Sequence, residues 1–168
     1  MSDPSGNVIS LHGIRVLIVE DVNSISALVS KFMTNYGAQD VEVVKTVGGA
    51  WQALQRNDYD IVLLDYMLSG EIGLPLLDLI RDSEEEALMR LAVIVLTATK
   101  AKDLMERSID AGADGYLAKP VPPDRLADRM LQAIEARRTR AERALAERAA
   151  AAEAAADDGE ESEAAGEG

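Results

Sequence analysis

Five polar side chains that could do chemistry stand at or beside the ends of short apolar runs: Glu20, Asp21, Asp65, Thr97 and Lys119. Three carboxylates brought together repel one another, so a site built from them needs a cation. Oxygen ligands without cysteine or histidine suit Mg²⁺ or Mn²⁺. A hydroxyl and an ammonium group would complete a phosphoryl-binding site. Asp65 is then the candidate nucleophile toward phosphorus, and its attack would give an acyl phosphate.

The apolar runs that carry these residues are typical of buried parallel strands. Residues 61–64 read IVLL and lead directly into Asp65. Residues 14–19 and 91–96 form comparable runs, and further strands are expected over 41–44 (VEVV) and 113–118 (ADGYLA). Helical patterns alternate with these runs, and every connection is short, which predicts a doubly wound α/β domain with a five-stranded parallel sheet. In such sheets ligands bind past the carboxyl ends of the strands, so we expect the five polar side chains at one edge.

The first helical pattern covers residues 22–36 and has the spacing of an amphipathic helix. Its apolar positions are Val22, Ile25, Leu28, Val29, Phe32, Met33 and Tyr36. Further helices are expected after Gly49, over 74–80, over about 100–111 and after Asp124. Residues 82–86, all acidic apart from one serine, are expected to form a surface connection.

The composition narrows the classes of function. The chain has 168 residues, no cysteine and a single histidine, His12, which excludes disulfides and thiolate chemistry and argues against histidine-based metal sites. No apolar run is long enough for a membrane span, and no signal peptide is visible, so we expect a cytoplasmic protein without a membrane partner. The net charge of −13 argues against direct nucleic-acid binding.

The two ends differ from the central part in composition. Residues 1–13 show little pattern and are expected to be disordered, and residues 14–136 form the predicted domain. Residues 137–156 are rich in Ala, Arg and Glu, so the last helix is expected to continue through them. Residues 157–168 are acidic and contain glycine, which predicts a disordered tail.

Taken together, these motifs resemble the receiver domain of two-component response regulators, in its CheY-like, stand-alone form. The resemblance covers residues 14–136 and depends on the acidic pair, on Asp65, on Thr97, and on Lys119 followed by Pro120. Gly73, eight residues after Asp65, also agrees with the family. The resemblance implies a flavodoxin-like fold with strand order 2-1-3-4-5.

The resemblance also implies a role for each site residue. Asp65 would be phosphorylated by a histidine kinase or a phosphotransfer protein. Mg²⁺ would be bound by Asp21, Asp65, the carbonyl of Met67 and, through water, Glu20. Lys119 would contact the phosphoryl group, and its peptide bond to Pro120 would be cis. Thr97 would be the switch hydroxyl, and Tyr116 the aromatic side chain that turns inward with it.

Some positions depart from the family pattern. Glu20 stands where aspartate is commoner, and Ser69 stands where the family usually has proline, which implies a softer loop. Met67 and Thr99, at positions that tune dephosphorylation in relatives, provide no acid or amide to orient a water molecule. This implies a phosphoryl group that is not lost rapidly.

These observations predict a single-domain response regulator that is not an enzyme in the usual sense. No room for an output domain is expected after residue 125, so output would be docking to an unknown protein or removal of phosphoryl groups from a kinase. Receivers place this surface on the fourth helix, fifth strand and fifth helix. One alternative is a pseudo-receiver scaffold that binds partners through its extended last helix. A Mg²⁺-dependent phosphatase is disfavoured, because Met67 stands where its general acid would be.

Overall fold

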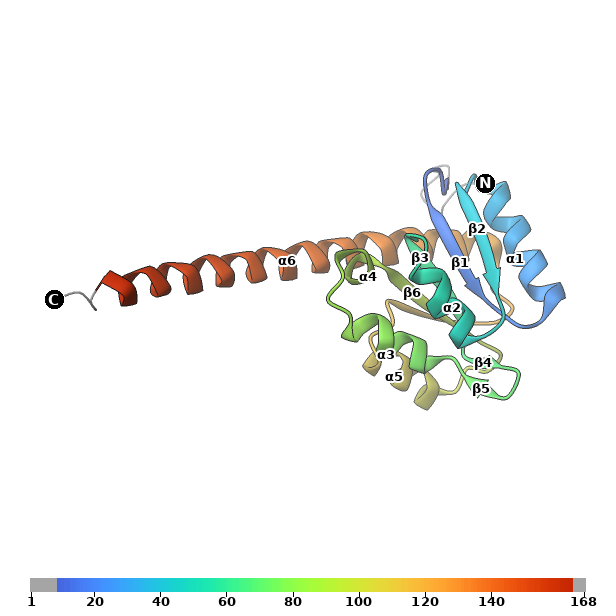
Figure 1. The fold of residues 1–168 in the computed structure, drawn as a ribbon. Coiled ribbons are helices and arrows are strands. Elements are labelled where there is room, and N and C mark those ends of the chain that lie inside the picture. Colours follow the sequence, from blue (N-terminus) through green and yellow to red (C-terminus); the bar gives the residue numbers. More distant parts are fainter. Residues whose placement is uncertain (1–8, 165–168) are drawn as a thin grey trace.

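A computed structural model describes residues 9–164, and it describes side chains as far as Asp157. Five strands form one sheet, in which every neighbouring pair is parallel. They are β1 (Arg15–Val19), β2 (Asp40–Val44), β3 (Ile61–Asp65), β6 (Ala92–Thr97) and β7 (Gly115–Ala118). Their order in the sheet is β2-β1-β3-β6-β7, which confirms the predicted doubly wound receiver fold (Figure 1).

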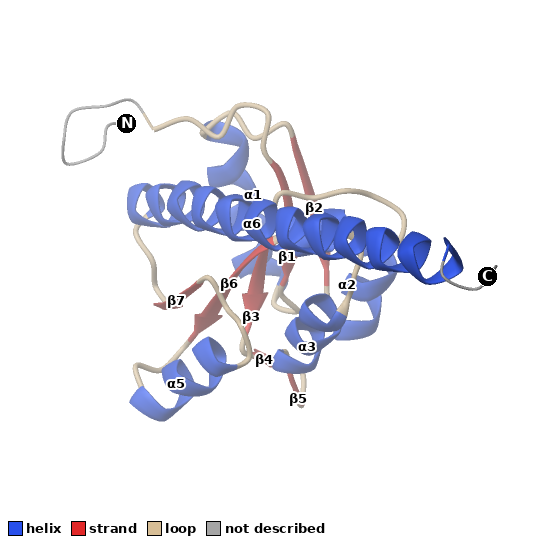
Figure 2. Ribbon diagram, turned by 90° about the vertical axis from the view of Figure 1, so that its left-hand side faces the viewer, coloured by secondary structure: helices blue, strands red, loops and turns tan. Residues whose placement is uncertain are grey.

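Helices cover both faces of the sheet. They are α1 (Asn23–Asn35), α2 (Val47–Leu54), α3 (Leu74–Asp82), α4 (Glu86–Arg90), α5 (Lys102–Asp110) and α6 (Pro123–Ala164). Successive side chains of a strand point to opposite faces, so each strand feeds two cores. Ile18 and Leu63 pack with α1 and α6 on one face, while Val62 and Leu64 pack with α2 and α3 on the other. Figure 2 shows α6 crossing the sheet on the side of α1.

The central strand β3 is buried along its whole length, and this accounts for its unbroken apolar sequence. It pairs with β1 on one side and with β6 on the other. Asp65 therefore ends a strand whose neighbours, β1 and β6, are each paired with a further strand on their other side.

Capping residues mark the ends of two neighbouring helices. Thr46 accepts a hydrogen bond from the Gly49 N–H at the start of α2, and Gly37 has a φ of 82° just past α1.

Two small elements were not expected from the sequence. Strands β4 (Met67–Leu68) and β5 (Glu71–Ile72) form an antiparallel hairpin just after Asp65, and Gly70 has the positive φ that its turn requires. Helix α4 begins at Glu86, the last residue of the expected acidic surface connection, and its Leu88 is buried against the core. Both elements are too short to produce a recognisable period in the sequence.

The ordered part of the chain begins earlier than predicted. Residues 1–8 lie outside the described part, but Ile9 and Leu11 are buried, and the Leu11 N–H donates to the Tyr36 carbonyl at 2.7 Å. His12 forms a bridge with Ala38. The expectation of disorder through residue 13 is therefore wrong for residues 9–13, because contacts with a distant segment order them.

Helix α1 is less regular in burial than its pattern predicted. Met33 and Tyr36 are buried, but Val22 and Leu28 are 43% and 52% exposed, and Ser26 is buried in their place. Some apolar side chains of this helix therefore lie outside the core. The exposed Val22 and Leu28 are close to the carboxyl edge of the sheet.

Helix α6 extends far beyond the sheet. It begins past the carboxyl end of β7, crosses the sheet, and meets the opposite edge where Arg138 bonds Asp60 at 2.6 Å. Past Leu145, every described side chain to Asp157 is exposed, and the helix projects away from the domain (Figure 1). The helical prediction for 137–156 agrees with this helix, which continues to Ala164 into the segment predicted as a disordered tail; residues 165–168 lie outside the described part. None of the described helices is both long enough and apolar enough to cross a membrane.

Candidate phosphoryl and metal site

The structure brings the five predicted polar side chains to the carboxyl edge of the sheet. Glu20 and Asp21 follow β1, Asp65 is the last residue of β3, Thr97 is the last residue of β6, and Lys119 follows β7. Glu20, Asp65 and Thr97 are buried, with 3%, 7% and 3% of their surface exposed. The long gaps in sequence are closed by the parallel arrangement of the strands, which places all their carboxyl ends together.

Lys119 links two of the buried carboxylates. Its Nζ donates to Asp65 Oδ2 at 2.8 Å and to Glu20 Oε2 at 3.0 Å. Burial alone would lower the pKa of Lys119, but these hydrogen bonds and the two negative charges raise it on balance. Burial raises the pKa of Glu20, although the Val22 N–H and Lys119 partly oppose that effect. The site therefore holds a charged lysine against a carboxylate that is poorly solvated.

The three carboxylates suit a divalent cation. Glu20, Asp21 and Asp65 each offer an oxygen atom, and these atoms lie within 4.8 Å of one another. One lysine balances only one of the three negative charges, and the donors are hard oxygens, which magnesium and similar ions prefer. The carbonyl of Met67 was the other predicted ligand. Met67 lies beside the site, because its N–H donates to Asp65 Oδ1 at 3.2 Å. The residues present thus fit the cation that the sequence implied.

Asp21 is held by a residue that the sequence analysis treated only as a loop feature. Both the N–H of Ser69, at 3.1 Å, and its hydroxyl donate to Asp21 Oδ2. These hydrogen bonds lower the pKa of Asp21. The only hint in the sequence was that Ser69 stands four residues past Asp65. The sequence did not show that Ser69 would contact Asp21.

Thr97 and Tyr116 meet at the loop after β6. The Thr97 hydroxyl accepts a hydrogen bond from the Thr99 N–H at 3.3 Å. The half-buried Tyr116 donates through its hydroxyl to the Thr99 carbonyl at 3.1 Å. The peptide bond between Lys119 and Pro120 is cis, as the resemblance implied. The two predicted switch residues are therefore connected through one residue, Thr99.

Gly73 packs tightly against the end of β3, which carries Asp65. Its N–H donates to the Tyr66 carbonyl at 2.9 Å. A Cβ atom at this position would lie only 2.4 Å from the Asp65 carbonyl oxygen and 3.0 Å from Leu64 Cδ1. Only glycine permits so close an approach, and this accounts for its place eight residues after Asp65.

An apolar groove of about 510 Å³ lies beside the site. Ile25, Leu28 and Phe32 of α1 form one wall, and the segment 119–121 forms the other. Lys119 lines the groove and also contacts Asp65, so the groove and the carboxylate site are continuous. The sequence analysis missed this groove because it treated the apolar residues of α1 as core.

Comparison with known proteins agrees with this geometry. Residues 16–131 match the response regulator receiver domain family. The phosphate regulon transcriptional regulatory protein PhoB of Klebsiella pneumoniae is 34% identical over 117 residues, which are 69% of this chain and 49% of that protein. The chemotaxis protein CheY-3 of Vibrio cholerae is 27% identical over 121 residues, 72% of this chain and 92% of that protein.

Solved structures give the same result. The receiver domain of the sensor histidine kinase PA1611 from Pseudomonas aeruginosa, which has a magnesium ion coordinated in its active-site cleft, is 27% identical with a TM-score of 0.64. The match covers 73% of this chain and 98% of that domain. This chain belongs to the receiver-domain family of two-component response regulators. It spans about half of the length of the PhoB regulator that it matches.

Proposed function

We propose that this protein is a phosphorylation switch in which Asp65 accepts a phosphoryl group from a histidine kinase or a phosphotransfer protein. The observation that supports it best is the pairing of the buried Asp65 with Lys119 at 2.8 Å, next to two further carboxylates. A cation held by Glu20, Asp21, Asp65 and the Met67 carbonyl, Mg²⁺ in this proposal, would supply positive charge opposite the phosphoryl oxygens.

In the proposed transfer, a carboxylate oxygen of Asp65 forms a bond to phosphorus while the bond from phosphorus to the donor's imidazole nitrogen breaks. The electron pair of that bond leaves with the imidazole, and the product is an acyl phosphate. Lys119 already lies where it can donate to a phosphoryl oxygen in exchange for one of its two carboxylate partners. It would thereby neutralise charge that develops in the transition state.

The same residues give a route to an output surface. A phosphoryl group on Asp65 would offer the Thr97 hydroxyl a charged acceptor, and the hydroxyl would turn to donate to it and leave the Thr99 N–H, from which it now accepts. Tyr116, bonded to the Thr99 carbonyl, would follow. We propose that this shift changes the surface formed by α5, β7 and α6, which then docks an output protein. The protein would act as a switch and not as a conventional enzyme.

The apolar groove beside Lys119 is our proposed docking place for the phosphodonor protein. Exposed Leu28 and half-buried Ile25 offer an apolar surface of helical shape next to the phosphoacceptor. A Leu28→Glu variant is expected to react normally with acetyl phosphate and to lose transfer from a phosphorylated histidine-containing donor. Equal loss with both reagents would contradict a docking role.

The experiment that tests the switch is the intact mass after incubation with acetyl phosphate, with and without Mg²⁺, beside an Asp65→Ala control. A Mg²⁺-dependent gain of one phosphoryl group, absent in the control, is the expected result. Absence of the gain in folded protein would refute the proposal and favour a scaffold that binds partners through α6.

A further inference from the structure

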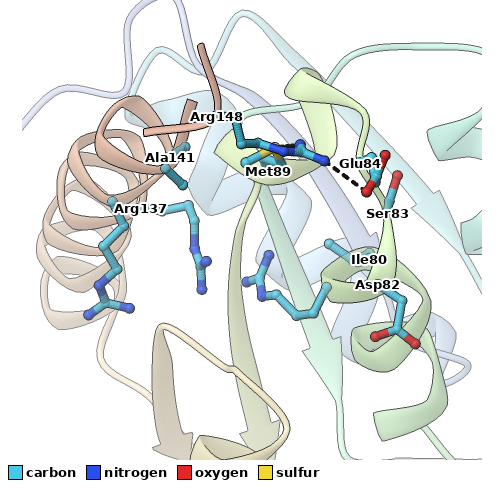
Figure 3. A pocket seen from close by; sticks show the side chains of 11 residues that line it. Ile80, Asp82, Ser83, Glu84, Met89, Arg137, Ala141 and Arg148 are labelled. Atoms are coloured by element: carbon cyan, nitrogen blue, oxygen red, sulfur yellow. Dashed lines mark hydrogen bonds and ion pairs between the residues drawn. The ribbon is translucent and has the colours of Figure 1, made fainter. Parts of the chain in front are cut away.

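A second cavity lies at the opposite edge of the sheet from Asp65. It has a volume of about 430 Å³ and lies between the end of α3, the loop to α4, and α6. Four arginines line it: Arg81, Arg137, Arg140 and Arg148. Three of them come from α6, on the segment that sequence analysis treated as a helical extension (Figure 3).

The inner end of this cavity has more positive charge than its one buried acid balances. The Asp114 side chain is 1% exposed, and Arg81, Arg137 and Arg140 approach its carboxylate at 2.8, 2.7 and 3.4 Å. Burial, together with the neighbouring Arg137 and Arg140 guanidinium groups, lowers the pKa of Arg81 to about 10 despite Asp114. A further anion at this point would therefore be attracted by guanidinium groups that are already held in place.

At the outer end of the cavity, Arg148 can change its partner. Arg148 reaches over Met89 to Glu84 at 2.8 Å (Figure 3), and the Glu84 side chain is 84% exposed. Such an exposed ion pair contributes little, so Arg148 is free to turn toward another anion. Asp82, the other acid of the lining, is exposed. The remaining wall includes small or apolar side chains from both helices, among them Ile80 and Ala141.

We propose that this cavity binds a diphosphate group, either free or carried by a nucleotide. Guanidinium forks match phosphate oxygens in pairs, and four of them around one cavity favour a compact anion with several charges. The volume falls within the range of small-ligand sites. Because three of the arginines belong to α6 and Arg81 belongs to α3, a bound diphosphate would fasten α6 to α3. This inference does not depend on phosphorylation of Asp65.

Isothermal titration calorimetry with pyrophosphate and with ADP tests the proposal, in Mg²⁺-free buffer at physiological ionic strength. Arg140→Gln and Arg148→Gln are suitable variants, because their side chains are 64% and 46% exposed and the domain will stay folded. Each is expected to weaken binding about tenfold, the loss of one charged hydrogen bond. Arg143→Gln removes the same charge from an exposed position of α6 outside the cavity and is the matched control.

The proposal is supported if the Arg143 variant binds like the unaltered protein while the other two bind more weakly. Tighter binding of ADP than of pyrophosphate would identify a nucleotide, and the reverse would identify a free diphosphate. Equal weakening by all three variants would show general attraction to α6 and overturn a built site. Absence of measurable heat with both ligands would overturn it as well.

Discussion

At the scale of single residues, the site brings three carboxylates together, and Lys119 balances only part of their negative charge. Lys119 serves two carboxylates, while Asp21 depends on hydrogen bonds from Ser69. The sequence was sufficient to name all five polar residues, because each stands at the end of an apolar run. It could not show how Lys119 divides between its partners or that Ser69 holds Asp21, since both depend on the path of separate loops in space.

Mg²⁺ is expected to stabilise the folded protein. Three carboxylate oxygens within 4.8 Å exist only in the fold, so a cation that binds them shifts the unfolding equilibrium. At about one hundred times its dissociation constant the gain is about 2.7 kcal/mol. Asp21→Asn should lose most of this gain, whereas Asp78→Asn, on an exposed position of α3, should keep it. Thermal melts with Mg²⁺ and with EDTA provide the measurement, and equal gains in both variants would contradict the site.

At the scale of elements, β1, β3 and β6 were predictable because each is an apolar run that is buried along nearly all its length. The edge strands β2 and β7 are less buried, and their places followed from the alternation of strands and helices. The hairpin β4–β5 and helix α4 were not predictable, since two to five residues cannot show a period. Ile9 and Leu11 were missed for a different reason: the segment has no pattern of its own, and the hydrogen bond from Leu11 to Tyr36 orders it. Local sequence shows periodicity, and it does not show contacts with a distant segment.

Gly73→Ala is expected to destabilise the domain by about 1–3 kcal/mol, because the new methyl group would collide with the Asp65 carbonyl. The same change at Gly48, in α2, meets no atom within 4 Å. Gly48→Ala should therefore stabilise the protein slightly, by up to about 1 kcal/mol, through better helix propensity. Urea unfolding of the two variants gives the comparison. A loss of the same size at both positions would refute the steric explanation.

Tyr36 connects the end of α1 to the first turn of α6 through its hydrogen bond to Asp124. Burial and this partner raise its pKa from 10 to about 12. The protonated phenol is thus favoured in the fold, and its contribution is complete below pH 10 and is lost as the pH rises toward 12.

Tyr36→Phe is accordingly expected to cost about 2 kcal/mol below pH 10, and this difference should shrink as the pH approaches 12. Urea midpoints of both proteins across this pH range measure it. A difference that stays constant with pH would show that the phenol does not titrate as expected.

At the scale of the whole molecule, α6 joins two parts with different roles. Its first half is core, with Met130 and Ile134 buried, and Arg137 pairs with Asp114 at the amino edge of the sheet. Past Leu145 its described side chains are all exposed, although Arg148 still bonds Glu84 in the loop before α4. Strong helix propensity predicted the continuation, but the sequence did not indicate that Arg137 and Arg140 would converge on one buried acid.

Shortening the chain after Arg148 is expected to leave the free energy of unfolding unchanged within about 0.5 kcal/mol, because the described side chains from 149 to 157 are all exposed. Circular dichroism should show the lost helix. Shortening after Ala136 should cost about 3 kcal/mol or more, since Asp114 would lose Arg137 and Arg140. Equal stability of the two shortened chains would contradict the anchoring role of these arginines.

The direction in which α6 leaves the domain has a mechanical consequence. From Arg148, which still bonds Glu84, to Ala164 the helix has 16 steps, so at a rise of 1.5 Å per residue the projecting part is about 24 Å long. A helix of this length acts as a lever: a tilt of about 5° at its base moves its far end by about 2 Å. A repacking around Tyr116 too small to alter the core would thus be magnified into a displacement on the side of the molecule away from Asp65.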